Sequence, residues 1–371
     1  MSVSNGLNFE EVRLQEVNLF VGVSGSGKSR FLSSFFNVAR FAIGNELNRP
    51  IFLGQWELEA EINGSIYKWV CKRESDLNNR GVVLYEQIKV KDNTSNEFTP
   101  LVSRTTDRFQ YNNSNLPKLD FSKSCIELLK DEDLINPIYQ GFRNVIRRKF
   151  SHGGVDNTLT YLGVDKSFEK NFENSASRDN ALYSLFNLPL NLRLYLIKKY
   201  LINEYNEIII FFKQLFPNID KCSIVNQSKE KSIGGYTPVF MVTEKGVENK
   251  IQLNDLSSGM IKVLLILTDI ITMPKGFIYE LDEYENSLGI NVINFLPSLL
   301  LEHQSSKQFL ITTHHPYLIN KMPISNWYVF SRKGNQVKIK YGEELIKKYG
   351  KSSQDSFIKL INDPFYSSEN I

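Results

Sequence analysis

Cysteine, net charge and long apolar runs are all scarce in this sequence, and each shortage removes a class of protein. Its 371 residues include three cysteines, Cys71, Cys125 and Cys222. They are odd in number and scattered, with no Cys or His neighbour at metal-ligand spacing, which argues against a disulfide framework and against a zinc site. Scattered thiols of this kind are typical of a protein in the reducing cytoplasm.

Hydropathy argues against the membrane and secretory classes. No apolar run reaches the roughly 18 residues that a membrane-spanning helix needs. The first residues, MSVSNGLNFEEVRL, lack the charged-then-apolar layout of a signal peptide. We therefore expect a cytoplasmic protein with no membrane partner. The formal net charge of +3 neither demands nor excludes DNA as a partner.

Apolar segments of strand length alternate with helical patterns towards both ends of the chain. With 42% hydrophobic and 23% charged residues, the composition is that of a globular protein with room for one large or two medium domains. Asn63 and Gly64 predict a tight hairpin. Strands are predicted at residues 17–21, 52–62, 65–72, 82–90, 222–226, 239–243, 277–281 and 308–312, and helices at 28–43, 257–271 and 290–302.

The middle of the chain has a different pattern. Residues 92–115 are polar, which predicts loops, and residues 121–216 are mostly helical in pattern. The C-terminal part predicts a short hairpin and a basic helix. Together these patterns predict an α/β fold with a mostly parallel central sheet, an antiparallel β subdomain and a helical insertion lobe. The corresponding division places a first lobe with the antiparallel subdomain at 1–118, the helical insertion lobe at 119–220 and a second lobe at 221–371.

A glycine-rich loop follows the first of these strands. Residues 22–29, GVSGSGKS, match the phosphate-binding pattern GxxxxGK[ST] between an apolar strand and a helix. Backbone N–H groups of such a loop close around phosphates, Lys28 reaches the β- and γ-phosphates, and the Ser29 hydroxyl binds Mg²⁺. A turn that only caps a helix would not need this spacing. The residues expected to hold the nucleotide are Gly22, Ser24, Gly25, Ser26, Gly27, Lys28, Ser29 and Arg30.

The predicted strand at 277–281 is followed by two acids, Asp282 and Glu283. Asp282 would hold Mg²⁺, directly or through water, and Glu283 would polarise the attacking water. An acidic helix cap after a strand would give the same local pattern. Because the phosphate-binding loop is present in the same chain, we favour the catalytic interpretation.

Two further segments suit contacts with phosphate. Ser257, Ser258 and Gly259 open the helix before the acidic strand, where they form either a second anion site or a plain N-cap. His314, after the strand at 308–312, suits a sensor of the γ-phosphate, the alternative being a surface histidine. Its neighbour His315 could share that role. The order of the segments along the chain favours the functional interpretation of both.

These segments together resemble those of a known family. GVSGSGKS, LSSGM, FIYELDEYENSL and ITTHHP are similar to the motifs of ABC-type ATPases grouped with the SMC, RecF and OLD proteins. Within that group the set looks most like the small AAA-type ATPase subunits of bacterial anti-phage systems such as PARIS and Septu. The resemblance covers residues 10–90 and 240–325. It implies a P-loop ABC-type ATPase head that binds and hydrolyses ATP with Mg²⁺.

The resemblance also implies roles for single residues. Residues 22–29 would be Walker A, Asp282 the Walker B acid, Glu283 the catalytic base and His314 the switch histidine. Residues 256–259 would be the signature, which in the family contacts the γ-phosphate bound by a second protomer.

The dimer interface of the family bears on the next segment. Residues 285–288 resemble the stretch after Walker B that crosses that interface. Two departures from the family, Met260 in place of Glu or Gln and Gly289 in place of His, would alter this contact without removing a catalytic group.

Three features have more than one interpretation. The family's metal-binding glutamine is either Gln140, which fits the placement better, or Gln55. Glu280 lies inside an apolar strand, so it faces either a polar crevice or the edge of the sheet. Arg143 and Arg147 would share one face of a helix and contact a partner or a phosphate backbone, or simply a solvated face. A second basic cluster spans residues 338–351.

Three functions remain in competition. The first is an ATPase that dimerises with nucleotide and controls an effector, a nuclease or toxin from another chain, since the 56 residues after His315 leave no room for a nuclease domain. The second is a RecF-like DNA-binding ATPase in DNA repair, which would need a basic groove. The third, a transporter subunit, fits less well because of the long insertion.

Overall fold

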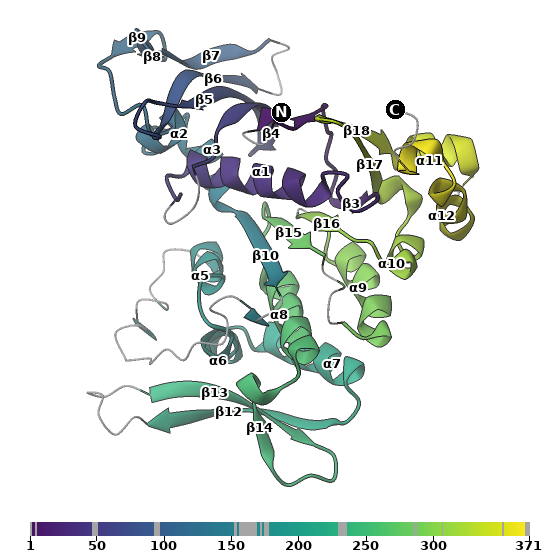
Figure 1. The fold of residues 1–371 in the computed structure, drawn as a ribbon. Coiled ribbons are helices and arrows are strands. Elements are labelled where there is room, and N and C mark those ends of the chain that lie inside the picture. Colours follow the sequence, from purple (N-terminus) through teal and green to yellow (C-terminus); the bar gives the residue numbers. More distant parts are fainter. Residues whose placement is uncertain are drawn as a thin grey trace.

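A computed structural model of the chain describes residues 2–3, 6–46, 51–92, 97–151, 154–155, 169–170, 173, 178–228, 236–283, 285, 288–305, 307–350 and 352–367. Within these ranges, fifteen strands form one continuous sheet in the order β11-β10-β15-β16-β3-β17-β18-β2-β1-β4-β5-β6-β7-β8-β9, and three more form a second sheet. Figure 1 shows helix α1 between the strands β4 to β7 of this sheet, drawn above it, and the strands β15 and β16, drawn below it.

The centre of the large sheet is parallel. Strands β10, β15, β16, β3 and β17 pair in that order, all parallel. The last strand, β17, forms an antiparallel hairpin with β18. The bounds of these strands are Val17–Val21 (β3), Val145–Ser151 (β10), Ile278–Asp282 (β15), Gln308–Thr312 (β16), Trp327–Lys333 (β17) and Gln336–Tyr341 (β18). The mostly parallel central sheet predicted from the sequence is thereby confirmed.

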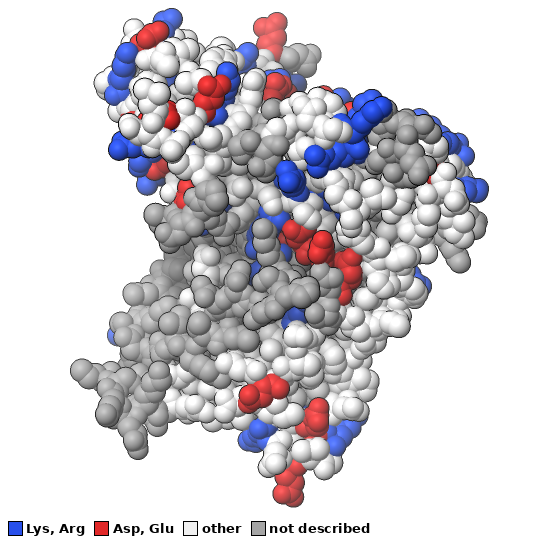
Figure 2. Space-filling view, in the orientation of Figure 1, with Lys and Arg blue, Asp and Glu red and all other residues white. Residues whose placement is uncertain are grey.

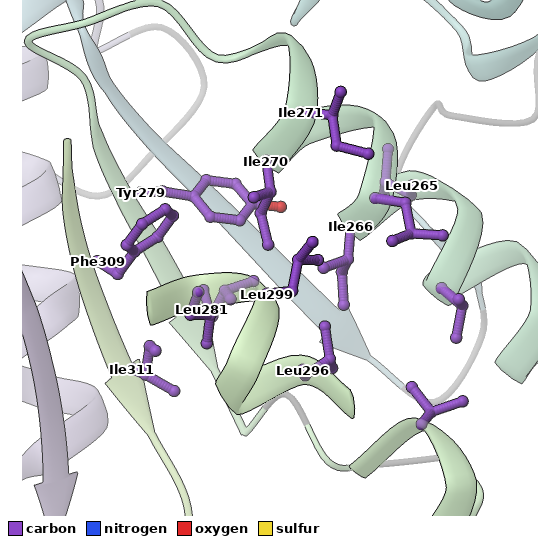
Figure 3. Packing of buried hydrophobic residues seen from close by; sticks show 14 of the residues in the cluster. Leu265, Ile266, Ile270, Ile271, Tyr279, Leu281, Leu296, Leu299, Phe309 and Ile311 are labelled. Atoms are coloured by element: carbon purple, nitrogen blue, oxygen red, sulfur yellow. The ribbon is translucent and has the colours of Figure 1, made fainter. Parts of the chain in front are cut away.

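Both faces of β3 and β16 and of the first part of β17 are buried, which explains their mostly apolar sequences. In β3, Leu19 contributes to one hydrophobic core and Phe20 to the other, because successive side chains of a strand point to opposite faces. The first core holds helices α8 and α9 against β15 and β16, as Figure 3 shows for Leu281, Ile311 and their neighbours. The second core holds α1 on the opposite face. Burial on both faces holds the ends of these strands in place, and so also fixes where the loops that follow them begin.

The helices have the following bounds. They are α1 (Lys28–Ala42), α2 (Cys125–Leu128), α3 (Asn136–Arg143), α5 (Arg178–Leu185), α6 (Leu190–Tyr200), α7 (Ile202–Leu215), α8 (Ser258–Thr272), α9 (Ile290–Glu302), α10 (Pro316–Lys321), α11 (Gly342–Tyr349), α12 (Ser353–Ile361) and α13 (Pro364–Ser367). The three helices predicted individually from the sequence, α1, α8 and α9, are confirmed. No helix in the described part of the chain has the length and hydropathy required to cross a membrane.

An antiparallel meander extends the sheet beyond β2 and β1. The predicted hairpin at Asn63 and Gly64 is confirmed, both residues having positive φ. The prediction of loops over 92–115 was wrong where the structure describes the chain, because three short strands lie there. Many of their residues are polar, and even the buried Arg104 is charged, which leaves too few apolar positions for a strand pattern. The strands outside the parallel core are β1 (Ser2–Val3), β2 (Asn8–Phe9), β4 (Gly54–Ile62), β5 (Ser65–Ser75), β6 (Gly81–Asp92), β7 (Thr99–Thr105), β8 (Phe109–Tyr111) and β9 (Ser114–Leu116).

The region predicted as mostly helical, 121–216, also contributes strands to the large sheet. Strand β10 lies within it and pairs with β15, and β11 (Gly154–Val155) follows as its antiparallel neighbour. Arg143 therefore ends helix α3 while Arg147 lies in a strand, so their predicted common helix face was wrong. The boundaries at 118 and 220 stay a prediction.

A second, antiparallel sheet lies beside helices α6 to α8 at the lower end of Figure 1. Its strands are β12 (Ile219–Ser228), β13 (Tyr236–Glu244) and β14 (Lys250–Gln252). The two strands predicted at 222–226 and 239–243 are confirmed within β12 and β13. This sheet packs on the same core as the signature-like helix α8.

Candidate functional site

The predicted site residues follow the carboxyl ends of neighbouring parallel strands. Strand β3 leads into the glycine-rich loop, β15 ends at Asp282, and β16 ends at Thr312, two residues before His314. Since these strands lie side by side in the order β15-β16-β3, their carboxyl ends meet at one edge of the sheet. On the face shown in Figure 2, acidic side chains gather at mid-height, over the region of β15, β16 and α9 in Figure 1.

The glycine-rich loop has a backbone that side chains would disrupt. Gly22 has φ of 152°, and a Cβ there would lie 2.5 Å from the carbonyl oxygen of Phe330 in β17. Gly27 is the N-cap of α1, with φ of 106°. Within the loop, Ser26 is buried while Ser24 and Gly25 are exposed, and Arg30 is exposed in the first turn of α1.

Lys28 is buried against this loop. Its Nζ donates to the carbonyl oxygens of Gly22 at 2.7 Å and Val23 at 3.0 Å, and the residue is 3% exposed. Burial lowers the pKa of Lys28 to about 8, although the nearby carboxylates of Glu283, Glu285 and Asp282 act in the opposite direction. The ammonium is thus held beside the acids that follow β15.

Asp282 is held by donors from three different elements. Thr312 Oγ1 donates to its Oδ1 at 2.9 Å and Arg147 Nη2 to its Oδ2 at 2.7 Å. Burial works to raise the pKa of Asp282, but the charge of Arg147 and hydrogen bonds from Ser29 and Thr312 outweigh it and lower the pKa. The structure therefore brings together Ser29 and Asp282, two of the three predicted metal-binding residues, which lie 253 positions apart in the sequence.

Glu283 leaves the strand in an uncommon conformation. Its φ is +49°, in the left-handed region that residues other than glycine rarely adopt. Its backbone N–H donates to Thr312 Oγ1 at 2.8 Å, so one buried hydroxyl contacts both acids. Its side chain is exposed at the carboxyl edge of the sheet. Strain of this kind, held by a specific contact, is often found at functional sites.

His314 lies next to the same acids. Its backbone N–H donates to Glu285 Oε1 at 2.7 Å. Burial lowers the pKa of His314, and the charge of Lys28 lowers it further. The imidazole is therefore neutral near pH 7. His315 is the N-cap of α10 and its backbone N–H contacts Thr313.

The signature-like residues stand apart from the loop of their own chain. Ser257 is the N-cap of α8, its Oγ accepting from the Met260 N–H at 3.3 Å, so the capping role considered for it is present. Ser257 and Ser258 are exposed and Gly259 is partly exposed. Among the described residues, no hydrogen bond or ion pair joins these three to residues 22–30. Further along α8, burial lowers the pKa of Lys262 to about 7, against the charges of Glu285 and Glu283.

Gln140 is not brought to this site by any contact within the described ranges. It lies in α3, and its Oε1 accepts from Arg143 Nη1 at 2.8 Å. Arg143 also lies over the ring of Tyr183, with 4.4 Å from its Cζ to the ring centroid. Gln55, the alternative, lies in β4 of the meander. The role of Gln140 as a metal ligand stays a prediction.

Sequence reasoning missed two residues of the site, Arg147 and Thr312. Arg147 reaches both Asp282 and Glu280, and Glu280 is buried in β15, which has a strand on each side. The sheet-edge interpretation of Glu280 was therefore wrong. A basic residue directly opposite an acid in a paired strand would have been the signal, but strand β10 itself had not been recognised.

One family model matches most of the chain. Residues 17–320 match the family model described as "AAA domain, putative AbiEii toxin, Type IV TA system". No curated protein sequence matches the chain.

Solved structures with a similar chain trace include three SMC heads. One is the SMC head bound to the C-winged helix domain of ScpA, with 12% identity, 91% of this chain and 94% of that chain covered, and a TM-score of 0.47. Another is the SMC head domain from Thermotoga maritima, with 14% identity and a TM-score of 0.37. This match covers 89% of this chain and 92% of that chain. A third is the SMC head domain with an extended coiled coil from Pyrococcus furiosus, bound to the C-terminal domain of ScpA. Its identity is 12% and its TM-score 0.43, and the match covers 95% of this chain and 95% of that chain.

The family match spans most of the chain and includes both the glycine-rich loop and the acidic strand. The parallel central sheet, with the glycine-rich loop after β3 and the acidic end of β15, is the α/β fold that the sequence predicts. The chain belongs to the AAA-domain family of that description.

Proposed function

We propose that this chain binds ATP with Mg²⁺ at the loop of residues 22–29 and hydrolyses it to ADP and phosphate. The observation that carries the proposal is the Ser29 hydroxyl placed near enough to Asp282 to help lower the pKa of that carboxyl, beside the buried ammonium of Lys28. A hydroxyl and a carboxylate are hard oxygen donors of the kind that Mg²⁺ prefers. Gly22 fits the same purpose, because the loop backbone there has no space for a side chain.

Different residues of the site have different roles in binding and hydrolysis. The loop backbone and Lys28 bind the phosphates, while Ser29 and Asp282 hold Mg²⁺, which when bound neutralises charge that develops on the phosphates. Glu283, exposed at the edge of the sheet, is placed to accept a proton from the attacking water. His314 is neutral near pH 7, and its ring can donate a hydrogen bond to the γ-phosphate.

Replacing Lys28 by Ala is expected to abolish measurable nucleotide binding. A charge-assisted contact with phosphate contributes roughly 1.5–3 kcal/mol, which corresponds to about 10–150-fold in affinity. Calorimetry with ATP and Mg²⁺ measures this loss, and Arg40→Ala, which removes a cation from the last turn of the same helix, serves as the matched control. Unchanged affinity of Lys28→Ala would place the nucleotide away from residues 22–29.

The affinity for ATP is expected to fall as the pH rises through the pKa of Lys28. Since that pKa is about 8, the side chain is largely charged at pH 7 and largely neutral at pH 9. The dissociation constant should therefore increase about 10-fold between these values. Lys28→Arg keeps its charge throughout and should give a flat profile in the same titration. An equal slope in Lys28→Arg would assign the effect to another group, with Lys262 the first candidate.

We further propose that two copies share the site and that the nucleotide state controls an effector, a nuclease or toxin from another chain, in anti-phage defence. The exposed Ser258 and the partly exposed Gly259, which make no hydrogen bond to the loop of their own chain in the described structure, support a role opposite a second protomer. The family description, which names a toxin–antitoxin system, is compatible with an effector partner. Purification of the chain with its neighbouring gene product, followed by release on addition of ATP, tests this proposal.

One of the two basic clusters that could support the RecF-like alternative is not available to bind DNA. Arg147 and Arg148 are engaged in ion pairs with Asp282 and Asp269, so they do not form a groove for DNA. Lys338 and Lys347 remain exposed on β18 and α11. Salt-dependent binding of duplex DNA by the ATP-bound protein would favour this alternative.

A further inference from the structure

Strand β10 places a buried arginine between two acids of the Walker B strand. In the parallel pairing of β10 with β15, Arg147 lies opposite Glu280. Asp282 follows two residues after Glu280, so the two carboxylates lie on the same face of the sheet. Their neighbours Tyr279 and Leu281 point to the other face, into the core with α8.

The contacts form a chain of three charges. Arg147 Nη2 donates to Asp282 Oδ2 at 2.7 Å, and its Nε lies 3.5 Å from Glu280 Oε2. The side chains of Arg147, Glu280 and Asp282 are 4%, 0% and 14% exposed. At this depth a salt bridge is screened little by solvent, and removing one partner leaves a buried charge without compensation.

The charge balance of this group has a consequence for a metal ion. A guanidinium in contact with Asp282 alone would cancel the charge that attracts Mg²⁺. Glu280 supplies a second carboxylate, so the three groups together keep one negative charge when all are ionised. Arg147 can thus fix the orientation of the Asp282 carboxylate, together with Thr312, without neutralising it.

We propose that Arg147 is a positioning residue for Asp282 and that Glu280 is the counter-ion that leaves Asp282 available to the metal. This inference rests on the proposed function of the site. Partners that orient a metal ligand typically contribute 10–100-fold to metal affinity, although they do not touch the metal.

The test measures how much Mn²⁺, as a spectroscopic substitute for Mg²⁺, is needed for binding of a non-hydrolysable ATP analogue. Glu280→Gln leaves Arg147 with Asp282 as its remaining counter-ion among the described residues, so the Mn²⁺ concentration at half-saturation should rise about 10-fold. Arg147→Gln should raise it by a similar factor because Asp282 loses its orientation. In the double variant, the second substitution should add no further rise, because Glu280 acts through Arg147.

A matched control comes from the next residue of the same strand. Arg148 points to the opposite face, where its Nε donates to Asp269 of α8 at 2.8 Å. Arg148→Gln also removes one partner of a buried ion pair, so it should lower the melting temperature while the Mn²⁺ half-saturation stays that of the wild type. Should Arg147→Gln not fold, Arg147→Lys replaces it, since one ammonium cannot reproduce the fork that reaches both acids, and a rise of about 10-fold is again expected.

Two outcomes separate this inference from the function on which it rests. If the wild type shows no Mn²⁺-dependent binding of the analogue, the proposed function fails and the inference with it. If the wild type binds, but Glu280→Gln and the Arg147 variant lower only the melting temperature, as Arg148→Gln does, the triad is structural and the inference alone is overturned.

Discussion

Replacing Glu283 by Gln is expected to slow ATP hydrolysis by about 10²–10⁴-fold while ATP binding stays intact. The carboxamide has nearly the shape of the carboxylate, and the backbone N–H that holds residue 283 to Thr312 is unchanged. Asp282, Ser29 and Lys28 also keep their contacts, so the variant loses the base and little else. Single-turnover hydrolysis and calorimetry, run on the same preparation, measure the two effects.

Glu285 provides the control for this substitution. It lies two residues further on and uses one carboxylate oxygen to accept the His314 N–H, a role that the oxygen of Gln can also fill. Glu285→Gln should therefore hydrolyse ATP at close to the wild-type rate. Wild-type turnover in Glu283→Gln would mean that the base lies elsewhere, and His314 would be the next residue to replace.

The parts of the site predicted from the sequence are those encoded within a few residues. The loop of residues 22–29 and the acids after β15 each combine a strand, a turn and a functional side chain in one short segment, so their local pattern is sufficient. Gly22 shows why such a pattern is strict, since a Cβ there would collide with the carbonyl of Phe330. Phe330 is 308 residues away from Gly22 in the sequence, but the motif already specifies glycine at position 22.

The parts that were missed depend on pairing between distant segments. Arg147 and Asp282 are 135 residues apart, and nothing near either residue in the sequence indicates the other. Strand β10 was not predicted because it contains three consecutive basic residues, and charged residues normally indicate solvent exposure. In this protein two of them are neutralised on opposite faces, Arg147 by the Walker B acids and Arg148 by Asp269. A buried strand with charged residues can be recognised from the sequence only when the residues that pair with those charges are known.

Replacing Gly259 by Asp is expected to abolish hydrolysis while ATP still binds to the loop of the same chain. Gly259 lies in the first turn of α8, where the partial positive charge of the helix end favours an anion such as the γ-phosphate of a second protomer. A carboxylate about 4 Å from that phosphate, at an effective dielectric constant near 20, is repelled by roughly 4 kcal/mol. Because residues 257–259 make no hydrogen bond or ion pair to residues 22–30 of their own chain in the described structure, binding should be spared. Calorimetry and steady-state turnover measure the two expectations.

Mixing Gly259→Asp with Lys28→Ala protein gives the sharper result, because each variant alone has two defective sites in a symmetric dimer. In the mixed dimer, one site combines both lesions, and the other pairs an intact loop from the Gly259→Asp chain with an intact α8 terminus from the Lys28→Ala chain. ATPase activity should therefore reappear on mixing, up to about a quarter of the wild-type rate for random exchange of equal amounts, if one intact site turns over alone. Mixing Lys28→Ala with Glu283→Gln is the matched control, since both lesions lie in the loop-bearing protomer of a site, so no site is intact and no activity should return. Wild-type turnover by Gly259→Asp alone would show that α8 does not complete the site, and the shared-site proposal would fall with it.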